Sequence, residues 1–288
     1  CWGCWPVSSA GSGEVSDMRH WLIALCCVLG LAKPLRADTL HEDWQSLLSR
    51  HVKTLRNGHA SAVDYQGFNA DRDQLSRYLA ALSAIEPEVY GTWSAARQLA
   101  FLINAYNAWT VELVLRHYGE IDSIKEIGGW FRSPWRQRFI PLLGKKRSLD
   151  DIEHGMIRRQ FSEPRIHFAV NCASIGCPAL RDEAYRGEVL ESQLDQATRR
   201  FLADRERNGL RDGQLYLSKV FDWYGKDFEQ GWRGQSSLEA FLAGYADELR
   251  LTAEALSALR ARRLPIAFSD YDWRLNDTAT VAESASDG

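Results

Sequence analysis

This chain has no excess of basic residues over acidic ones, which limits the kinds of partner that it can bind. The 288 residues contain 35 Lys and Arg against 38 Asp and Glu, a formal net charge of -3. Residues 1–37 hold three of the bases and two of the acids, which leaves 32 against 36 in the rest. Because nucleic-acid binding requires a basic surface that releases counterions from phosphates, we expect no nucleic-acid partner.

A long apolar run is also missing after residue 37. The most apolar stretch, "LAFLINAYNAWTVELVL", is interrupted by Asn104, Asn107 and Glu112, and polar side chains are costly in the centre of a bilayer. We therefore expect no transmembrane anchor in the mature chain. The shares of hydrophobic residues, 45%, and of charged residues, 25%, are those of an ordinary globular protein.

Residues 18–37 have the pattern of a secretory signal peptide. Met18 opens a basic start, an apolar run extends from Trp21 to Ala32, and the small residue Ala37 follows. The apolar run is too short to span a bilayer, as is typical of signals that are removed. We expect cleavage near Ala37 and a mature protein that is periplasmic or secreted. Residues 1–17 are interpreted as upstream sequence without a structural role.

Cysteine is scarce once residues 1–37 are set aside, because only Cys172 and Cys177 remain, in "IHFAVNCASIGCPAL". Four interpretations are open: a structural disulfide, a nucleophilic cysteine, a redox-active pair and a zinc clip. An oxidising compartment favours the disulfide. The four-residue spacer is longer than the two-residue spacer of redox catalysts, and the chain has no His-x3-His pair to complete a zinc site. We predict no metal site and no cofactor.

Hydrophobic periodicity predicts a mainly helical α+β fold with a small sheet. Helical spacing covers residues 40–55, 73–85, 93–118, 148–161, 188–202, 237–246 and 252–262. Strands are expected at 166–171, 214–218 and 264–268, with a hairpin around 139–143. No internal repeat or linker divides the chain, so we expect one globular domain over residues 38–276. The tail, residues 277–288, lacks core residues and is expected to be disordered.

The predicted helix 93–118 is apolar around almost its whole circumference, which indicates a central, buried helix. Asn104 and Asn107 lie one turn apart on it. Buried amides need hydrogen-bond partners. The two side chains therefore either brace a loop or orient a catalytic group, and the brace is the simpler interpretation.

The predicted strand 166–171 sets the direction of the side chains near the cysteines. Successive residues of a strand point to opposite faces. Cys172 is therefore expected on the apolar face and His167 on the other, which separates the two side chains unless the strand bulges.

A basic and aromatic stretch offers a candidate binding surface. Trp130, Trp135, Arg136 and Arg138 belong to it, and no acid occurs from residue 132 to residue 147. Guanidinium groups and aromatic rings can hold an anionic polymer, a lipid headgroup or a peptide carboxylate. A solvated hairpin with buried tryptophans is the simpler alternative, because charge runs usually face water.

Six segments together resemble a known family. They are "LAFLINAYNAWTVELVL", "SLDDIEHGMIR", "RIHFAVNCASIGCPAL", "YLSKVFDWYGKDF", the basic connection between the first two, and "YDWRLN". In this order they are similar to the family catalogued as domain of unknown function 547, over residues 63–276, and its bacterial members look like exported proteins. Gly176 departs from the family pattern, which has a serine there. The resemblance implies that the segments belong to one fold, and their residue types are similar to those of papain-like and transglutaminase-like thiol enzymes.

Two hypotheses about function follow, from different classes. In the first, the protein is an exported thiol-dependent hydrolase or acyltransferase that acts on amide or ester bonds. Cys172 attacks, and His154 or, alternatively, His167 accepts its proton. Glu153, Asn104 or Asn171 orients the imidazole, and an asparagine is the better candidate because Glu153 is adjacent to His154 on a helix and so points elsewhere.

In the second hypothesis the protein is a non-catalytic exported binding domain. Cys172 and Cys177 form a structural disulfide, and the basic-aromatic stretch contacts an unknown small-molecule, peptide or anionic envelope ligand.

Glu153 stands next to His154 in either case. Neighbours on a helix point in different directions, so Glu153 is not expected to share a site with His154.

Overall fold

The helix at the centre of the fold is α5 (Ala95–Leu115), within the segment whose apolar circumference predicts burial. In this computed structural model, which describes residues 39–128 and 133–286, every α5 residue from Leu99 to Leu115 is buried. Ser94 caps the helix, because its hydroxyl oxygen accepts a hydrogen bond from the backbone N–H of Arg97. The other elements of the main core pack around α5.

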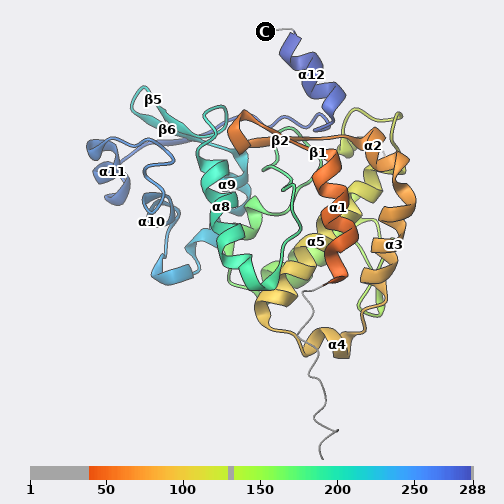
Figure 1. Ribbon diagram of the computed structural model, residues 1–288. Helices are drawn as coiled ribbons and strands as arrows, with labels where there is room; N and C mark the ends of the chain where they lie inside the picture. The colour runs from red at the N-terminus through yellow and green to blue at the C-terminus, as the bar shows by residue number, and fades with distance from the viewer. Residues whose placement is uncertain (1–38, 129–132, 287–288) are drawn as a thin grey trace, which may run out of the picture. The chain divides into compact units, whose positions relative to one another are not determined.

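The helices nearest α5 come from both sides of it in the sequence. Their bounds, with those of the adjoining short helices, are α1 (Glu42–His51), α2 (Tyr65–Ala70), α3 (Arg72–Ser83), α4 (Pro87–Gly91), α6 (Leu149–Ile152), α7 (Arg158–Gln160) and α8 (Leu190–Leu202). α2, α3, α6 and α8 contact α5 directly, and α1 packs on α3. Figure 1 shows α1, α3 and α5 side by side.

A second group of elements follows α8. It comprises α9 (Lys219–Tyr224), α10 (Leu238–Ala243), α11 (Ala253–Arg260), β5 (Gly209–Arg211), β6 (Gln214–Leu217) and β7 (Ile266–Phe268). β6 pairs antiparallel with β5 and parallel with β7. Phe221, Phe228 and Phe241 form the centre of a buried aromatic cluster here, distinct from the core around α5.

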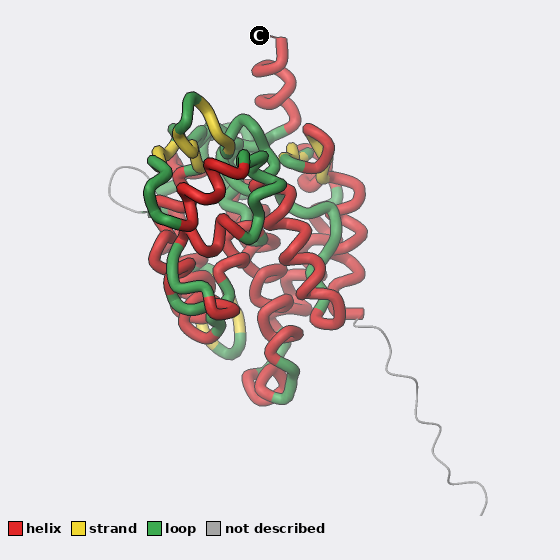
Figure 2. The backbone as a smooth tube through the Cα atoms, turned by 90° about the vertical axis from the view of Figure 1, so that its left-hand side faces the viewer, coloured by secondary structure: helices red, strands yellow, loops and turns green. Residues whose placement is uncertain are grey.

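Two hairpins complete the strands. β1 (Val52–Leu55) pairs with β2 (Ala60–Val63), and β3 (Ile140–Leu142) pairs with β4 (Lys145–Arg147). Figure 2 shows how short the strands are beside the helices. The predicted class, a mainly helical α+β fold with small sheets, is confirmed. The strands expected near 214–218 and 264–268 are present as β6 and β7.

The segment before the cysteines is not the strand that its alternating pattern predicts. Pro164–Phe168 is a 3-10 helix, and no strand follows it before Cys172. Proline suits the first turn of a helix because it lacks an N–H. Glu163 caps the turn by accepting a hydrogen bond from the backbone N–H of Arg165. The prediction of a strand over 166–171 is therefore wrong, and with it the alternation that separates His167 from Cys172.

Two asparagines of α5 supply the backbone partners that a neighbouring strand would have offered. The amide of Asn107 donates to the carbonyl of Ala169 at 2.9 Å, and its oxygen accepts from the N–H of Asn171 at 2.8 Å. Asn104 makes the same pair of bonds with the backbone of Tyr185, at 2.7 and 2.9 Å. Both asparagines brace loops, as the simpler interpretation predicts.

The "YDWRLN" motif closes around the cysteine turn. The N–H of Ile175 donates to the carbonyl of Arg274 at 2.9 Å, and the Asn276 amide donates to Asn171 Oδ1 at 3.3 Å. Ala173, directly after Cys172, has a φ of 63°, which is unfavourable for a residue with a Cβ. Its N–H donates to Asn171 Oδ1 at 2.9 Å. The turn is thus held in a strained conformation from both sides.

The two ends of the chain differ in what the structure describes. The predicted signal peptide and the segment before it lie outside the described residues. The tail that was expected to be disordered contains a helix, α12 (Thr278–Ser286). Asp277 accepts a hydrogen bond from the N–H of Ala279 at 3.2 Å, so a capping carboxylate supports the start of this helix, where none of residues 278–282 is buried.

We predict that Asn107→Ala lowers the free energy of unfolding by about 2–4 kcal/mol, because it leaves two buried backbone groups without partners. Urea unfolding followed by circular dichroism measures the change. Asn69→Ala, at an exposed asparagine of α2, is the control and should change the free energy by less than about 0.5 kcal/mol. An effect of Asn107→Ala no larger than this control would contradict the bracing role.

Candidate functional site

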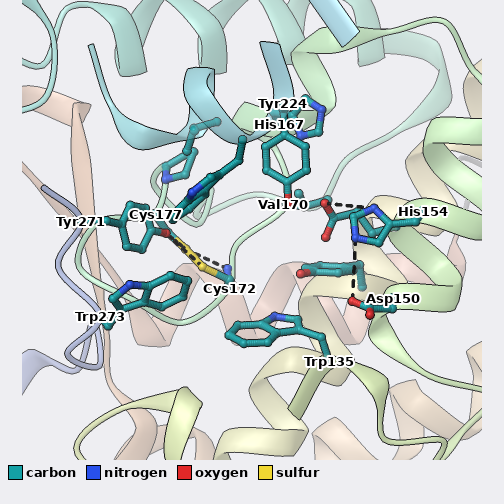
Figure 3. A pocket seen from close by; sticks show the side chains of 15 residues that line it. Trp135, Asp150, His154, His167, Val170, Cys172, Cys177, Tyr224, Tyr271 and Trp273 are labelled. Atoms are coloured by element: carbon teal, nitrogen blue, oxygen red, sulfur yellow. Dashed lines mark hydrogen bonds and ion pairs between the residues drawn. A yellow bond between two sulfur atoms is a disulfide. The ribbon is translucent and has the colours of Figure 1, made fainter. Parts of the chain in front are cut away.

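A pocket of about 430 Å³ lies where the cysteine turn, the end of α6 and the C-terminal motif meet. Its volume is in the range of small-molecule sites. The lining side chains are Tyr106, Trp135, Asp150, Glu153, His154, His167, Val170, Cys172, Cys177, Pro178, Val220, Trp223, Tyr224, Tyr271 and Trp273. Figure 3 shows the cysteines, Tyr271 and Trp273 on one side and Asp150 and His154 on the other.

Cys172 and Cys177 form a disulfide with a Cα–Cα distance of 6.2 Å. The Tyr271 hydroxyl lies 3.1 Å from the sulfur of Cys172 and 3.2 Å from that of Cys177. Burial raises the pKa of Tyr271, so its hydroxyl keeps the proton that it donates to the sulfurs. Cys177 is 3% exposed, whereas Cys172 is only partly buried. Cys172 is therefore the more accessible sulfur.

Gly176 leaves the room that the Tyr271 ring occupies. A Cβ at position 176 would lie 3.0 Å from three atoms of that ring, closer than ordinary van der Waals contact. The ring therefore packs directly on the turn between the cysteines. A glycine at this position therefore fits the placement of Tyr271 over the disulfide.

The helix that begins at Leu149 changes its pitch at the pocket. Ser148 and Asp151 form a capping box, and α6 is followed by a π-helical turn, Glu153–Ile157. Such turns insert an extra residue and are frequent at functional sites. Adjacent Glu153 and His154, the first two residues of this turn, both line the pocket, contrary to the expectation that they point apart.

Glu153 has a buried carboxyl group with an unsatisfied oxygen. The residue is 5% exposed. Of the buried side-chain atoms without a hydrogen-bond partner in the described part of the chain, Glu153 Oε1 is the one that lines the pocket. Its nearest ion-pair contact is His154 Nδ1 at 3.8 Å. Burial, with the Glu153 carboxyl group nearby, raises the pKa of Tyr224, so that hydroxyl remains a neutral donor.

The tautomer of His154 follows from its neighbour. Arg158 Nη1 lies 2.9 Å from His154 Nδ1. A guanidinium group can only donate, so Nδ1 accepts and the ring proton of neutral His154 is on Nε2. Nε2 lies 3.8 Å from Asp150 Oδ1. Nδ1, the ring nitrogen that could accept a proton, therefore already accepts a hydrogen bond from Arg158.

His167 is held by a carboxylate instead. Its Nε2 donates to Asp227 Oδ2 at 2.7 Å, and its ring stacks on Tyr224 with centroids 3.9 Å apart. Arg158 donates to both Asp227 oxygens, at 2.6 and 2.8 Å. Burial by itself would raise the pKa of Asp227, but the hydrogen bonds from His167 and Arg158 outweigh it and hold the pKa below the ordinary range. Asp227 is thus an anion that orients His167.

Three aromatic side chains form one wall of the pocket. Tyr271 packs on Trp223 and Trp273, with ring centroids 4.8 and 4.5 Å away, and the two indole rings contact each other at 5.6 Å. Trp135 meets Trp273 edge-on at 5.9 Å. Lys125 places its ammonium group 4.7 Å from the centroid of Trp273, a cation–π contact. The wall is apolar, and at least one of its rings is already in contact with a cation.

The structure brings some predicted site residues together and keeps others apart. Cys172, Cys177, His154, His167 and Trp135 line one pocket. Asn104 and Asn171 are buried in backbone bracing and do not line it.

The basic residues of the candidate binding surface lie outside the pocket. Arg136 and Arg138 are exposed and pair with Asp150 and Asp151 at 3.4 and 3.3 Å. Trp130 lies outside the described residues.

Several lining residues were not singled out from the sequence. Tyr271 and Trp273 belong to "YDWRLN", and Trp223 and Tyr224 belong to "YLSKVFDWYGKDF". Asp227, which holds His167 from outside the lining, belongs to the second motif as well. The only signal that could have found them is that both motifs are part of the family resemblance.

Metal and membrane sites have no support in the ranges 39–128 and 133–286. The His, Cys, Asp and Glu side chains there form no group of three or more that could hold a metal ion. No helix in these ranges is long and apolar enough to cross a membrane.

The fold and the site define a helix-rich α+β domain with an aromatic pocket that has a disulfide in its wall. Residues 90–202 match the model of the family described as protein of unknown function, DUF547, so the resemblance inferred from the motifs is confirmed. The matched segment contains α5, the π-helical turn and both cysteines. Neither a curated protein nor a solved structure matches the chain, and the similarity to papain-like enzymes stays a prediction.

We predict that Asp227→Asn lowers the free energy of unfolding at pH 7 by about 2 kcal/mol, since the charged Arg158 and His167 lose the carboxylate that they share. The pKa of Asp227 is lowered by folding, so its contribution is complete above the unfolded pKa of about 4 and is lost as the pH falls below it. The gap between wild type and variant should therefore narrow by about 1 kcal/mol between pH 5 and pH 3.

Urea unfolding at both pH values measures this gap. Asp222→Asn, which removes a surface partner of Lys219 on α9, is the matched control and should cost less than about 0.5 kcal/mol at either pH. A gap for Asp227→Asn that stays constant with pH would show that its charge does not stabilise the fold.

Proposed function

We propose that the mature protein is an exported binding domain for a small ligand, and that the ligand occupies the pocket around Glu153. The observation that carries this proposal is the buried Glu153 oxygen that has no hydrogen-bond partner in the pocket. The Cys172–Cys177 disulfide is a fixed part of the pocket wall. A donor group on the ligand would pair with the carboxylate.

The energetic argument is that an unpaired buried acceptor is costly. Leaving such a group without a partner costs about 1–3 kcal/mol, and a protein that needed only stability could replace it. Polar groups of this kind are retained where a ligand completes them. The apolar walls would supply the burial that small-molecule sites require, and the carboxylate would supply orientation.

The basic-aromatic stretch contributes less to binding than its composition suggests. Arg136 and Arg138 extend into solvent, and Asp150 and Asp151 compensate their charges. Trp135, by contrast, lines the pocket. We therefore propose the pocket as the ligand site and retain from the stretch only its tryptophan.

A thiol-dependent hydrolase or acyltransferase is the second candidate, and it needs the disulfide to be reduced. It is favoured by the partial exposure of Cys172 in the same pocket as two histidines. His167 suits the role of base better than His154. Asp227 fixes the proton of His167 on Nε2, which leaves the lone pair on Nδ1; catalytic triads also orient the base by a carboxylate, with the two ring nitrogens in exchanged roles.

The binding proposal is tested by measuring thermal stability with a small-molecule library. A compound that binds only the folded protein raises its melting temperature. Glu153→Gln should remove the shift, and without any compound its free energy of unfolding should be no more than about 1 kcal/mol below wild type, because Glu153 Oε1 has no hydrogen-bond partner to lose.

Glu188→Gln, which removes an exposed acid in the 3-10 turn before α8, is the control and should keep the shift. A large destabilisation by Glu153→Gln would mean that the carboxylate serves the fold. A library that never shifts the wild-type melting temperature would count against the pocket as a ligand site.

The thiol candidate is tested by alkylation and peptide mapping. The purified protein should show Cys172 and Cys177 unmodified by iodoacetamide until a reductant is added. After reduction Cys172 should react first, because it is the more exposed sulfur. Hydrolysis of p-nitrophenyl acetate by reduced wild type, and not by reduced Cys172→Ser, would support catalysis. Equal rates of hydrolysis for the two proteins would remove the candidate.

A further inference from the structure

The pocket has an uneven balance of charge. Its described lining residues include two carboxylates, Asp150 and Glu153, and two histidines, but no Lys or Arg. The other polar lining groups are phenol, indole and the disulfide sulfurs. An anionic ligand would have to approach the carboxylates without a compensating cation, so the lining favours a ligand of positive charge.

We infer that the ligand is an organic amine in its ammonium form, with the ammonium group at Glu153 and an apolar body against the aromatic wall. This inference rests on the proposed binding function and names the chemical class of the ligand. An ammonium group has only donors, and the unpaired Glu153 oxygen is an acceptor. The two match in charge and in hydrogen bonding.

The cations near the pocket do not fill this role. Arg158 donates to both oxygens of Asp227 and to His154. Arg136 pairs with Asp150 from an exposed position. In the described part of the chain Glu153 has no ion pair with a Lys or Arg side chain, and its one ion-pair contact is His154, 3.8 Å away.

The pocket has the polarity of an amphipathic amine. Asp150 and His154 lie at one side, and Tyr271, Trp273 and the disulfide lie at the other (Figure 3). The rings can also attract a cation. Lys125 lies over Trp273 and Arg158 lies over Tyr224, at 4.7 and 5.1 Å from the ring centroids. A ligand of about the pocket's volume, 430 Å³, can therefore contact both ends.

Three probes of similar shape and different charge test the inference: 2-phenylethylamine, 2-phenylethanol and phenylacetate. Calorimetric titration of the wild-type protein should give the tightest binding for the amine, by about tenfold over the alcohol, and the weakest for the acid. Glu153→Gln should bring the amine to the affinity of the alcohol and leave the alcohol unchanged. Asp150→Asn should weaken the amine by a smaller factor, and Glu188→Gln should change neither.

The outcomes separate the two proposals. An amine that binds no tighter than the alcohol, or an acid that binds tightest, overturns the ammonium inference and leaves a pocket that binds small molecules. The inference is also overturned if none of the three probes binds while library compounds still raise the melting temperature. A different result overturns the binding proposal itself: no compound raises the melting temperature of the wild-type protein.

Discussion

The candidate site depends on the hydrogen bonds that Asn107 makes to the backbone on both sides of Val170. The chain leaves the Pro164–Phe168 turn between two hydrophobic clusters, where no strand is present to satisfy its N–H and C=O groups. A side-chain amide from the central helix replaces that strand. Because Cys172 directly follows Asn171, Asn107 of α5 sets the position of the disulfide in the pocket.

Much of the fold could be predicted because it depends on local patterns. The burial of α5 follows from its apolar circumference, and Ser148 caps the next helix by a rule that needs only four residues. The strand over 166–171 failed for the opposite reason. Its alternation of side chains is real, but the choice of a 3-10 turn depends on Asn107, more than sixty positions away, and on Pro164 in its first turn.

The site could be predicted only in part. Residue type is enough to single out Cys172, His154 and His167, but the sequence does not show which side chains meet. Tyr271 contacts a sulfur from 99 positions away, and no spacing rule links the two. Glu153 was set aside because neighbours on a regular helix diverge, and the π-helical turn removes that regularity. Local rules therefore fail most where distant segments meet.

Three departures from local rules meet at the pocket. Ala173 has a left-handed backbone, Glu153 has an unpaired buried oxygen and the helix beside it changes pitch, all next to the same pocket. Each departure lowers stability. Single departures also occur elsewhere in the described fold, such as the unpaired atoms of Tyr90 and Gln235 and the positive φ of Arg250. The meeting of three different departures at one cavity is what a site maintained for binding, at the expense of stability, would produce.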